Sequence, residues 1–195
     1  IIKKERQKLK LQSQREKDNM TKGRLKKQKI GTVIKRDTLE NQVNTAYLGI
    51  GSNLGNKKIN IEKAKHLLET SSIKIIKCSS YYESPSWPNN NYPSYYNIVI
   101  KVKTNLTSPE LLIEIKKIEK SLGRVKTKKN KPRTCDIDII DFNGKILFFK
   151  INNDSIGIPH PRLSERNFVL IPLFEINKKW LHPKNKKKIS HLINK

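Results

Sequence analysis

Residues 134–142 read Thr-Cys-Asp-Ile-Asp-Ile-Ile-Asp-Phe, a run rich in β-branched and aromatic side chains that predicts a strand. Upstream of it, the apolar residues within 111–122 recur at helical spacing and predict a helix. Thr107 or Ser108 can cap the start of this helix, and Gly123 is placed to end it. This helix, followed by the strand, is the best-defined part of the chain.

The segments before this pair continue the alternation of strands and helices. They are expected as a strand at 46–50, a loop at 51–55, a helix ending near Thr70, a strand at 73–82, a long loop at 83–94 and a strand at 96–102. The order β-α-β-β-α-β predicts an α+β fold of the ferredoxin-like type, an antiparallel sheet with helices packed on one face. A hairpin near 146–158, a short helix around 167–175 and a polar end are expected after it.

The length of 195 residues favours one compact domain, at 45–195, preceded by a basic extension at 1–44. The extension has almost no aromatic residues and no sustained apolar stripe, so we expect it to be disordered or partly helical. It is read either as a solvated extension or as a basic arm for nucleic acid. The extension carries a formal charge of +9 and the domain +16, which favours polyanionic ligands unless the lysines only solvate the surface.

Several classes of protein are excluded by simple patterns. The longest apolar run, near 169–174, is far shorter than the ~20 residues that span a bilayer, so no membrane segment is expected. No secretory signal opens the chain, and we expect a cytoplasmic location. Cys78 and Cys135 lack the paired spacing of a zinc site, so both are expected to be reduced and buried.

Asp136 and Asp138 are candidate metal ligands. Residues two apart on a strand project from the same face, with Cα atoms about 6.5–7 Å apart. Carboxylates bind Mg²⁺ together with substrate phosphates and water, so such a pair suits a nucleotide enzyme. Asp is scarce in the domain and disfavoured in strands, which favours this reading over a solvent-facing edge.

Arginine gives an independent indication, because a chain that uses Lys elsewhere has four Arg in its domain, all near the aspartates or after His160. These are Arg124, Arg133, Arg162 and Arg166. The planar guanidinium grips phosphate oxygens in a bidentate manner, so its selective use favours phosphate binding. His160, held between two prolines, is either a hydrogen-bond donor to phosphate or a structural residue.

Two other patterns are weaker. Gly49, Gly51 and Gly55 do not have the spacing of a dinucleotide fingerprint or a P-loop, and we expect them to allow a tight strand-to-helix turn. Tyr95 and Phe168 either sandwich a flat ring or fill the core.

Several motifs, in this order, resemble the 6-hydroxymethyl-7,8-dihydropterin pyrophosphokinase family of folate biosynthesis, over about 46–175. They are Gly-Ser-Asn-Leu-Gly at 51–55, Tyr-Tyr-Asn at 95–97, Gly-Arg-Val at 123–125, Pro-Arg-Thr-Cys-Asp-Ile-Asp at 132–138 and Ile-Pro-His-Pro-Arg-Leu at 158–163, continuing to Glu165, Arg166 and Phe168. The resemblance implies Mg²⁺-dependent transfer of diphosphate from ATP to the hydroxymethyl oxygen of the pterin, which yields AMP and the pterin diphosphate.

The resemblance also implies a role for each matching residue. Asp136 and Asp138 would hold two Mg²⁺ ions, and Arg124 and Arg133 would stabilise charge on the transferring diphosphate. The ATP ligands would be Glu119, Arg133, His160 and Arg166. The pterin ligands would be Ser84, Pro85, Trp87, Tyr95, Asn97 and Phe168, with Tyr95 and Phe168 stacked on the ring and Asn97 bonded to its edge.

The chain departs from the family pattern at 130–131, which read Asn-Lys where Trp-Gly is common. This difference affects the loop that in the family closes over the reactants. Besides ATP and the hydroxymethyl dihydropterin, other folate-pathway enzymes are candidate partners. The printed sequence leaves no room for them, so any such coupling is expected between chains.

Two alternatives remain open. A basic ferredoxin-like domain is also typical of an RNA-recognition module, which stacks bases on aromatic residues of its central strands. The fourth strand here instead presents Asp136 and Asp138, which would repel a phosphate backbone unless a metal intervened, so we do not expect nucleic acid as a partner. In the second alternative, the chain has the same fold but no activity, because the altered loop cannot close.

Overall fold

The computed structural model describes residues 43–124, 131–151 and 154–193. Apart from its last two residues, the expected extension at 1–44 lies outside this range. The elements are β1 (Asn44–Ser52), α2 (Lys57–Thr70), β2 (Lys74–Cys78), β3 (Tyr82–Ser84), β4 (Tyr95–Thr104), α3 (Ser108–Ser121), β5 (Asp136–Phe142), β6 (Leu147–Ile151), β7 (Asp154–Ile158), a 3₁₀ turn (Leu163–Glu165), α4 (Asn167–Ile176) and α5 (Ile189–Ile193).

Within the described residues, β1 to β5 form one antiparallel sheet. The order is β2-β4-β1-β5, and the short β3 pairs with β4. Strand β4 thus lies between β1 and β2, which α2 connects, and β1 lies between β4 and β5, which α3 connects. The α+β class and the antiparallel sheet are confirmed, and β6 pairs with β7 as the expected hairpin.

Both long helices begin at polar caps that the sequence supplies. The Asn56 side chain accepts a hydrogen bond from the backbone N–H of Ile59 at 3.1 Å and caps α2. At α3, Thr107 is the cap, and its backbone N–H donates to the carboxylate of Glu110 at 2.8 Å. These bonds satisfy backbone groups that the first turn of a helix leaves without partners.

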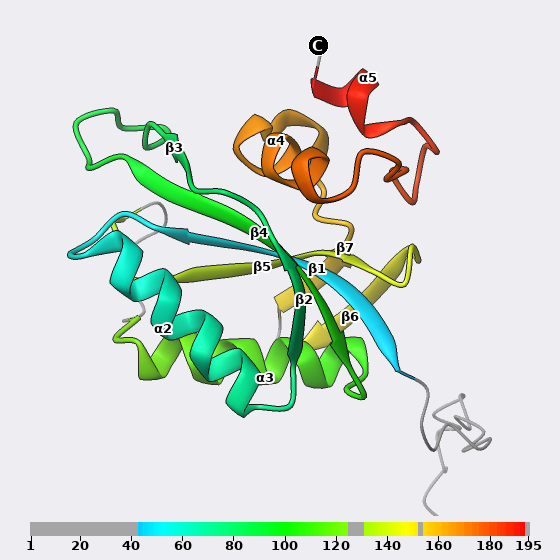
Figure 1. The fold of residues 1–195 in the computed structure, drawn as a ribbon, viewed down its shortest axis with the longest axis horizontal. Helices are drawn as coiled ribbons and strands as arrows, with labels where there is room; N and C mark the ends of the chain where they lie inside the picture. Colours follow the sequence, from blue (N-terminus) through cyan, green and yellow to red (C-terminus); the bar gives the residue numbers. More distant parts are fainter. Residues whose placement is uncertain (1–42, 125–130, 152–153, 194–195) are drawn as a thin grey trace, which may run out of the picture. The chain divides into compact units, whose positions relative to one another are not determined.

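The sheet is covered on both faces. Alternate side chains of β1 lie on opposite faces. Leu48 and Ile50 belong to the apolar cluster beneath α2 and α3, whereas Tyr47 belongs to a second cluster with residues of α4 and α5. Figure 1 shows α2 and α3 on one side of the sheet and α4 on the other. The two helices of the β-α-β-β-α-β order thus lie on one face, as expected, and the additional helix α4 supplies a second apolar surface through Leu170 and Leu173.

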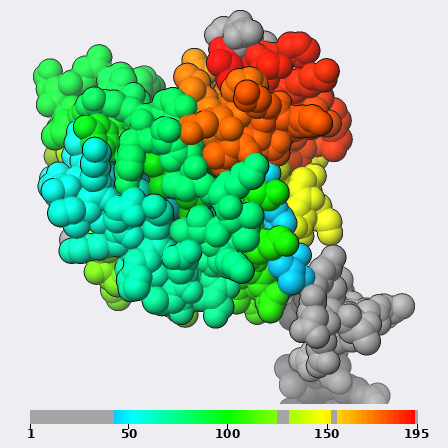
Figure 2. Space-filling view, viewed as in Figure 1, coloured from blue at the N-terminus to red at the C-terminus, as the bar shows by residue number. Residues whose placement is uncertain are grey.

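The segment after α4 was expected to be a polar end because of its lysines, but it also contributes buried apolar side chains. Trp180, Ile189 and Leu192 are buried in the second cluster, and Leu181 pairs with Lys188 in an isolated bridge. Figure 2 shows this segment, orange to red, packed against the rest of the described domain. The few apolar residues of the segment thus cover the sheet face that α4 alone would leave open.

Two smaller expectations need correction. The strand expected at 73–82 is divided into β2 and β3, and residues 79–81 between them belong to neither strand. Cys135 is buried as expected, but Cys78 is exposed, because β2 is an edge strand with most of its residues on the surface. Both thiols are free.

Candidate functional site

Strand β5 presents its two candidate ligands on one face of the sheet. Ile137 and Ile139 are buried in the cluster beneath α2 and α3, so Asp136 and Asp138, which alternate with them, project from the opposite face. Their side chains are 27% and 40% exposed. The apolar partners in the alternation thus fix the direction of both carboxylates and leave them accessible.

Strand β1 places glycines next to these two carboxylates. Gly51 pairs with Asp136, and Gly49 pairs with Asp138. The expectation that both glycines serve a strand-to-helix turn is wrong, since of the three only Gly55 has a positive φ, of 65°. A Cβ atom added at Gly51 would lie 3.0 Å from Oδ1 of Asn97. The glycines therefore make room beside the aspartates and beside β4.

Three of the four domain arginines pair with the two aspartates. Arg124 Nη1 lies 2.6 Å from Oδ1 of Asp136, and Arg133 Nη1 lies 3.0 Å from Oδ2 of the same residue. Arg166 Nη1 lies 2.9 Å from Oδ2 of Asp138. Residues from the end of α3, the segment before β5 and the start of α4 thus meet at one place, as the sequence pattern predicted.

The charges in this group support one another. Burial acts to raise the pKa of Asp136, but Arg124 and Arg133 outweigh it and hold that pKa below its ordinary value. Asp136 is therefore a carboxylate at neutral pH. A group of guanidinium ions around carboxylates on an accessible face is suited to exchange partners with an anionic ligand and its cations.

Glu119, on α3, lies behind this group and is buried. Its carboxylate accepts hydrogen bonds from the backbone N–H of Ile137 at 2.8 Å and from Lys116 Nζ at 2.7 Å, and it pairs with Arg124. Burial raises the pKa of Glu119, while the two cations act to lower it. The position of Glu119 links α3 to β5, and Lys116 is a member of this group that sequence reasoning missed.

His160 shares the electrostatic environment of the site. Burial, followed by the positive charge of Arg166, lowers the pKa of His160 below 6.5, although Asp138 opposes this. The ring is therefore neutral at pH 7. Because its Nδ1 accepts a hydrogen bond from the backbone N–H of Arg162 at 3.1 Å, the ring proton resides on Nε2, which is available as a donor.

The residues that were expected to bind the pterin differ in their contacts and in their exposure. Asn97 on β4 donates a hydrogen bond to Oγ of Ser84 on β3 at 2.9 Å, so these two lie together. Burial raises the pKa of Tyr95, whose hydroxyl interacts with Arg133. Trp87 is 71% exposed, and Phe168 is exposed at the start of α4, with the guanidinium of Arg166 5.8 Å from its ring centroid.

The remaining expected residue, Pro85, is exposed next to Ser84. Among the aromatic pairs of the described residues, Tyr95 and Phe168 do not stack on each other. The expected sandwich therefore remains a prediction about the state with a ring between them. The expected departure at Asn130 lies outside the described residues, whereas Lys131 places its ammonium 6.0 Å from the ring centroid of Tyr92.

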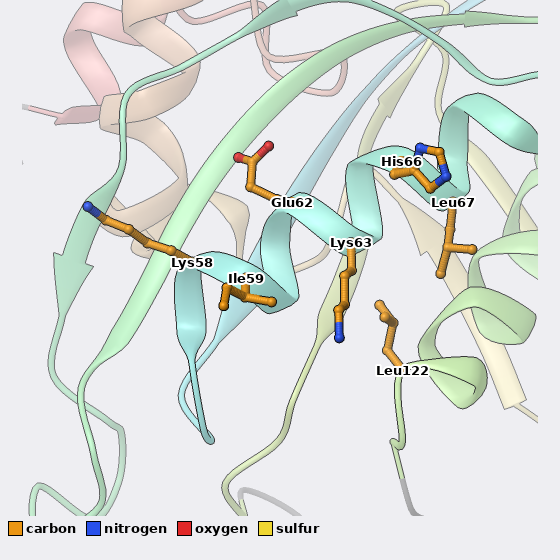
Figure 3. Close-up of a pocket in the computed structure, with 7 residues that line it drawn as sticks. All are labelled: Lys58, Ile59, Glu62, Lys63, His66, Leu67 and Leu122. Atoms are coloured by element: carbon orange, nitrogen blue, oxygen red, sulfur yellow. The ribbon is translucent and has the colours of Figure 1, made fainter.

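A hollow of 510 Å³ lies away from the aspartates, on the side of the sheet that α2 covers. It is lined by Lys58, Ile59, Glu62, Lys63, His66, Leu67 and Leu122. Leu122 directly follows α3 and the other lining residues belong to α2, whose side chains Figure 3 shows around the hollow. It holds none of the residues that the sequence pattern selected.

The described residues lack two kinds of feature. They hold no group of three or more His, Cys, Asp or Glu residues arranged as a metal cage, so any cation at Asp136 and Asp138 needs further ligands from elsewhere. No helix among them has the length and apolar composition needed to cross a membrane.

Comparison with known families decides the identity of the fold. The sequence profile of the 7,8-dihydro-6-hydroxymethylpterin-pyrophosphokinase (HPPK) family matches residues 47–178. The chain belongs to the HPPK family. This match begins within β1, ends just after α4 and contains every residue that was selected as a ligand from the sequence.

Relatives of two kinds share this HPPK region. The 2-amino-4-hydroxy-6-hydroxymethyldihydropteridine pyrophosphokinase of Aquifex aeolicus is 41% identical over 139 residues, which are 71% of this chain and 84% of that protein. The folic acid synthesis protein fol1 of Pneumocystis carinii is 44% identical over 137 residues, 70% of this chain but 18% of that protein.

A solved structure supports the fold. In the crystal structure of Plasmodium falciparum HPPK-DHPS with pteroate, the similar region covers 80% of this chain and 43% of that chain, with a TM-score of 0.66 and 20% identity. The chain thus spans less than half of that larger protein. At this identity the likeness concerns the HPPK fold.

Proposed function

We propose that this chain transfers diphosphate from ATP to 6-hydroxymethyl-7,8-dihydropterin, yielding AMP and the pterin diphosphate for folate biosynthesis. The proposal is supported by membership of the HPPK family and by the relative from Aquifex aeolicus, most of whose length the chain covers. The single observation that carries it is the meeting of Arg124, Arg133 and Arg166 with Asp136 and Asp138 on one accessible sheet face.

Asp136 and Asp138 fit the role of Mg²⁺ ligands. They are adjacent, ionisable oxygen donors, partly exposed, and each now has a cationic partner that a metal ion can replace. Two Mg²⁺ ions, when bound, would neutralise charge on the triphosphate and favour attack by the hydroxymethyl oxygen. With two protein carboxylates, the phosphate oxygens and water would complete the coordination.

The chain's own residues would bind and orient the triphosphate. With Mg²⁺ held by the carboxylates, the guanidinium groups of Arg124 and Arg133 would be free to bond the diphosphate that is transferred. His160 would donate from Nε2 to a phosphate oxygen, and Arg166 would bind the phosphates beside it. Glu119 is buried and held by backbone and cations, so we place its contribution in orienting Arg124.

The pterin would lie beside β4, next to Asn97, whose side chain packs closely over Gly51. Tyr95 and Phe168 would stack on its two faces, and Asn97, which already bonds Ser84, would bond its edge. The backbone around Ser84, Pro85 and Trp87 would border it. In this arrangement the hydroxymethyl group would point from β4 toward Asp136, because the carboxylates lie on β5 beyond β1.

The experiment that tests this proposal is a calorimetric titration of the pterin into the protein, with Mg²⁺ and a non-hydrolysable ATP analogue present. We expect saturable 1:1 binding that depends on the analogue or on Mg²⁺. Absence of pterin binding under these conditions would refute the proposal. Other folate-pathway enzymes remain proposed partners, in view of the two-part HPPK-DHPS chain of Plasmodium falciparum.

A further inference from the structure

Asn53 lies at the junction of three segments that surround the site. It directly follows β1, and it is 2% exposed. It has no role among the residues selected from the sequence, where its motif was taken as a loop. A buried side-chain amide needs partners for its oxygen and for both N–H groups, so its contacts show what it holds in place.

The oxygen side of Asn53 is bonded to the segment that carries Arg133. The backbone N–H of Arg133 donates to Oδ1 of Asn53 at 2.8 Å, and the backbone N–H of Asn53 donates back to the carbonyl of Arg133 at 3.2 Å. This reciprocal pair fixes the backbone three residues before Asp136. The guanidinium of Arg133 reaches Asp136 from that fixed position.

The nitrogen side of Asn53 is bonded to the loop at 85–94. Its Nδ2 donates to Oγ of Ser86 at 3.1 Å and to the carbonyl of Pro93 at 3.2 Å. Ser86 is also buried, and its hydroxyl donates to the same Pro93 carbonyl at 2.7 Å. One amide thus closes the two ends of the loop that joins β3 to β4, next to Tyr95.

We propose that Asn53 is a positioning residue that holds the Arg133 segment and the 85–94 loop in a fixed relation, so that the nucleotide side and the pterin side of the site are aligned. This inference rests on the proposed function, because that function assigns the two sides to the two substrates. Asn is the residue that the position requires, since the contact to Arg133 needs an acceptor and the contact to Ser86 and Pro93 needs donors.

The two halves of the amide can be tested separately. Asn53→Asp keeps an acceptor for the Arg133 N–H and removes the donors to Ser86 and Pro93. Asn53→Leu removes both. Ser86→Ala leaves Asn53 intact and weakens only the loop side. The matched control is Asn44→Ala, at the opposite end of β1, where the side chain bonds the carbonyl of Leu106.

Binding of the ATP analogue with Mg²⁺, and then of the pterin, is measured by calorimetry for each variant. For Asn53→Asp and Ser86→Ala we expect the pterin Kd to rise about tenfold, because one to two hydrogen bonds are lost. The Kd of the ATP analogue should stay within about twofold of the wild-type value. For Asn53→Leu both constants rise, and for Asn44→Ala neither changes. Equal losses for both ligands in Asn53→Asp, or none, would overturn the inference.

Amide hydrogen exchange on the ligand-free protein separates this inference from the proposed function. Asn53→Asp should raise exchange in the 85–94 loop and leave the Arg133 N–H protected, whereas Asn53→Leu should expose both. If the variants show these changes in exchange but the wild-type protein binds no pterin, the proposed function fails and the alignment by Asn53 holds. If exchange in the loop is unchanged in Asn53→Asp, the alignment by Asn53 is wrong.

Discussion

Arg166 Nη1 lies 2.9 Å from Oδ2 of Asp138, so the start of α4 meets the middle of β5 across 28 residues of chain. Each of the two aspartates has such a partner, and the partners come from different elements. The α4 face of the sheet, which the sequence did not predict to be covered, thus supplies one of the cations of the site. The ion pairs leave both carboxylates accessible to a ligand that carries its own cations.

Asp138→Ala should abolish turnover and leave the fold intact. Its side chain is partly exposed and outside both apolar clusters, so its removal costs little packing. We expect the rate of AMP formation to fall at least ~100-fold, because several kcal/mol of transition-state stabilisation are lost. Thermal unfolding should shift little. Glu69→Ala, on the exposed surface of α2, is the control, and a rate for Asp138→Ala unchanged at saturating Mg²⁺ would refute the metal role.

Gly51→Ala should weaken pterin binding more than Gly49→Ala. A Cβ at Gly51 would lie 3.0 Å from Oδ1 of Asn97, whereas a Cβ at Gly49 would lie 3.2 Å from the terminal methyl group of Ile140, which can rotate. We expect the pterin Kd to rise several-fold for Gly51→Ala and to change little for Gly49→Ala. Calorimetry on both variants checks this, and an equal effect would contradict a role of the Asn97 side chain in binding the pterin.

Trp180→Phe should destabilise the domain by about 2 kcal/mol, because it removes a charge-assisted hydrogen bond within the core. The indole Nε1 donates to Oδ2 of the buried Asp141 at 2.7 Å, and burial raises the pKa of that carboxyl. Urea unfolding measures the change. The double variant Trp180→Phe with Asp141→Asn should lose less than the sum of the two single changes.

His182 should make stability depend on pH. Burial lowers the pKa of His182, and its Nδ1 accepts a hydrogen bond from the backbone N–H of Lys184 at 3.2 Å, which needs the unprotonated nitrogen. Since the folded pKa is lower than the unfolded one, the stabilisation is complete above pH 6.5 and is lost as pH falls through the folded pKa.

Urea unfolding at pH 7.5 and pH 5 tests this dependence on His182. Wild type should lose more stability between these pH values than His182→Gln does. His66→Gln, a change on the exposed surface of α2, serves as the control. If the two variants show the same dependence on pH as wild type, His182 does not contribute to it.

Local patterns were sufficient for the elements that carry the ligands. The stripe and cap of α3 and the alternation in β5 are set by neighbours in sequence, so both elements could be predicted, and with them the common face of Asp136 and Asp138. The scarcity of Arg and Asp in a Lys-rich chain then selected the residues that meet there.

What sequence could not provide depends on contacts between distant segments. The pairing of Gly49 and Gly51 with the aspartates depends on the register between β1 and β5. The burial of Trp180 could not be read from a segment of lysines, because one aromatic side chain gives no periodicity. The side chain of Asn53 bonds residues that are 33, 40 and 80 positions away in the sequence, which local patterns do not reveal. Its place in a Gly-Ser-Asn-Leu-Gly motif was nevertheless a usable signal.

The most direct test of the account is the formation of AMP from ATP and Mg²⁺, measured with and without 6-hydroxymethyl-7,8-dihydropterin. If the arginines and aspartates of this sheet face serve diphosphate transfer, AMP should appear at a rate that rises with the pterin and saturates. It should accumulate in equal amounts with the pterin diphosphate. AMP formation that is absent, or that is the same without the pterin, would contradict the account.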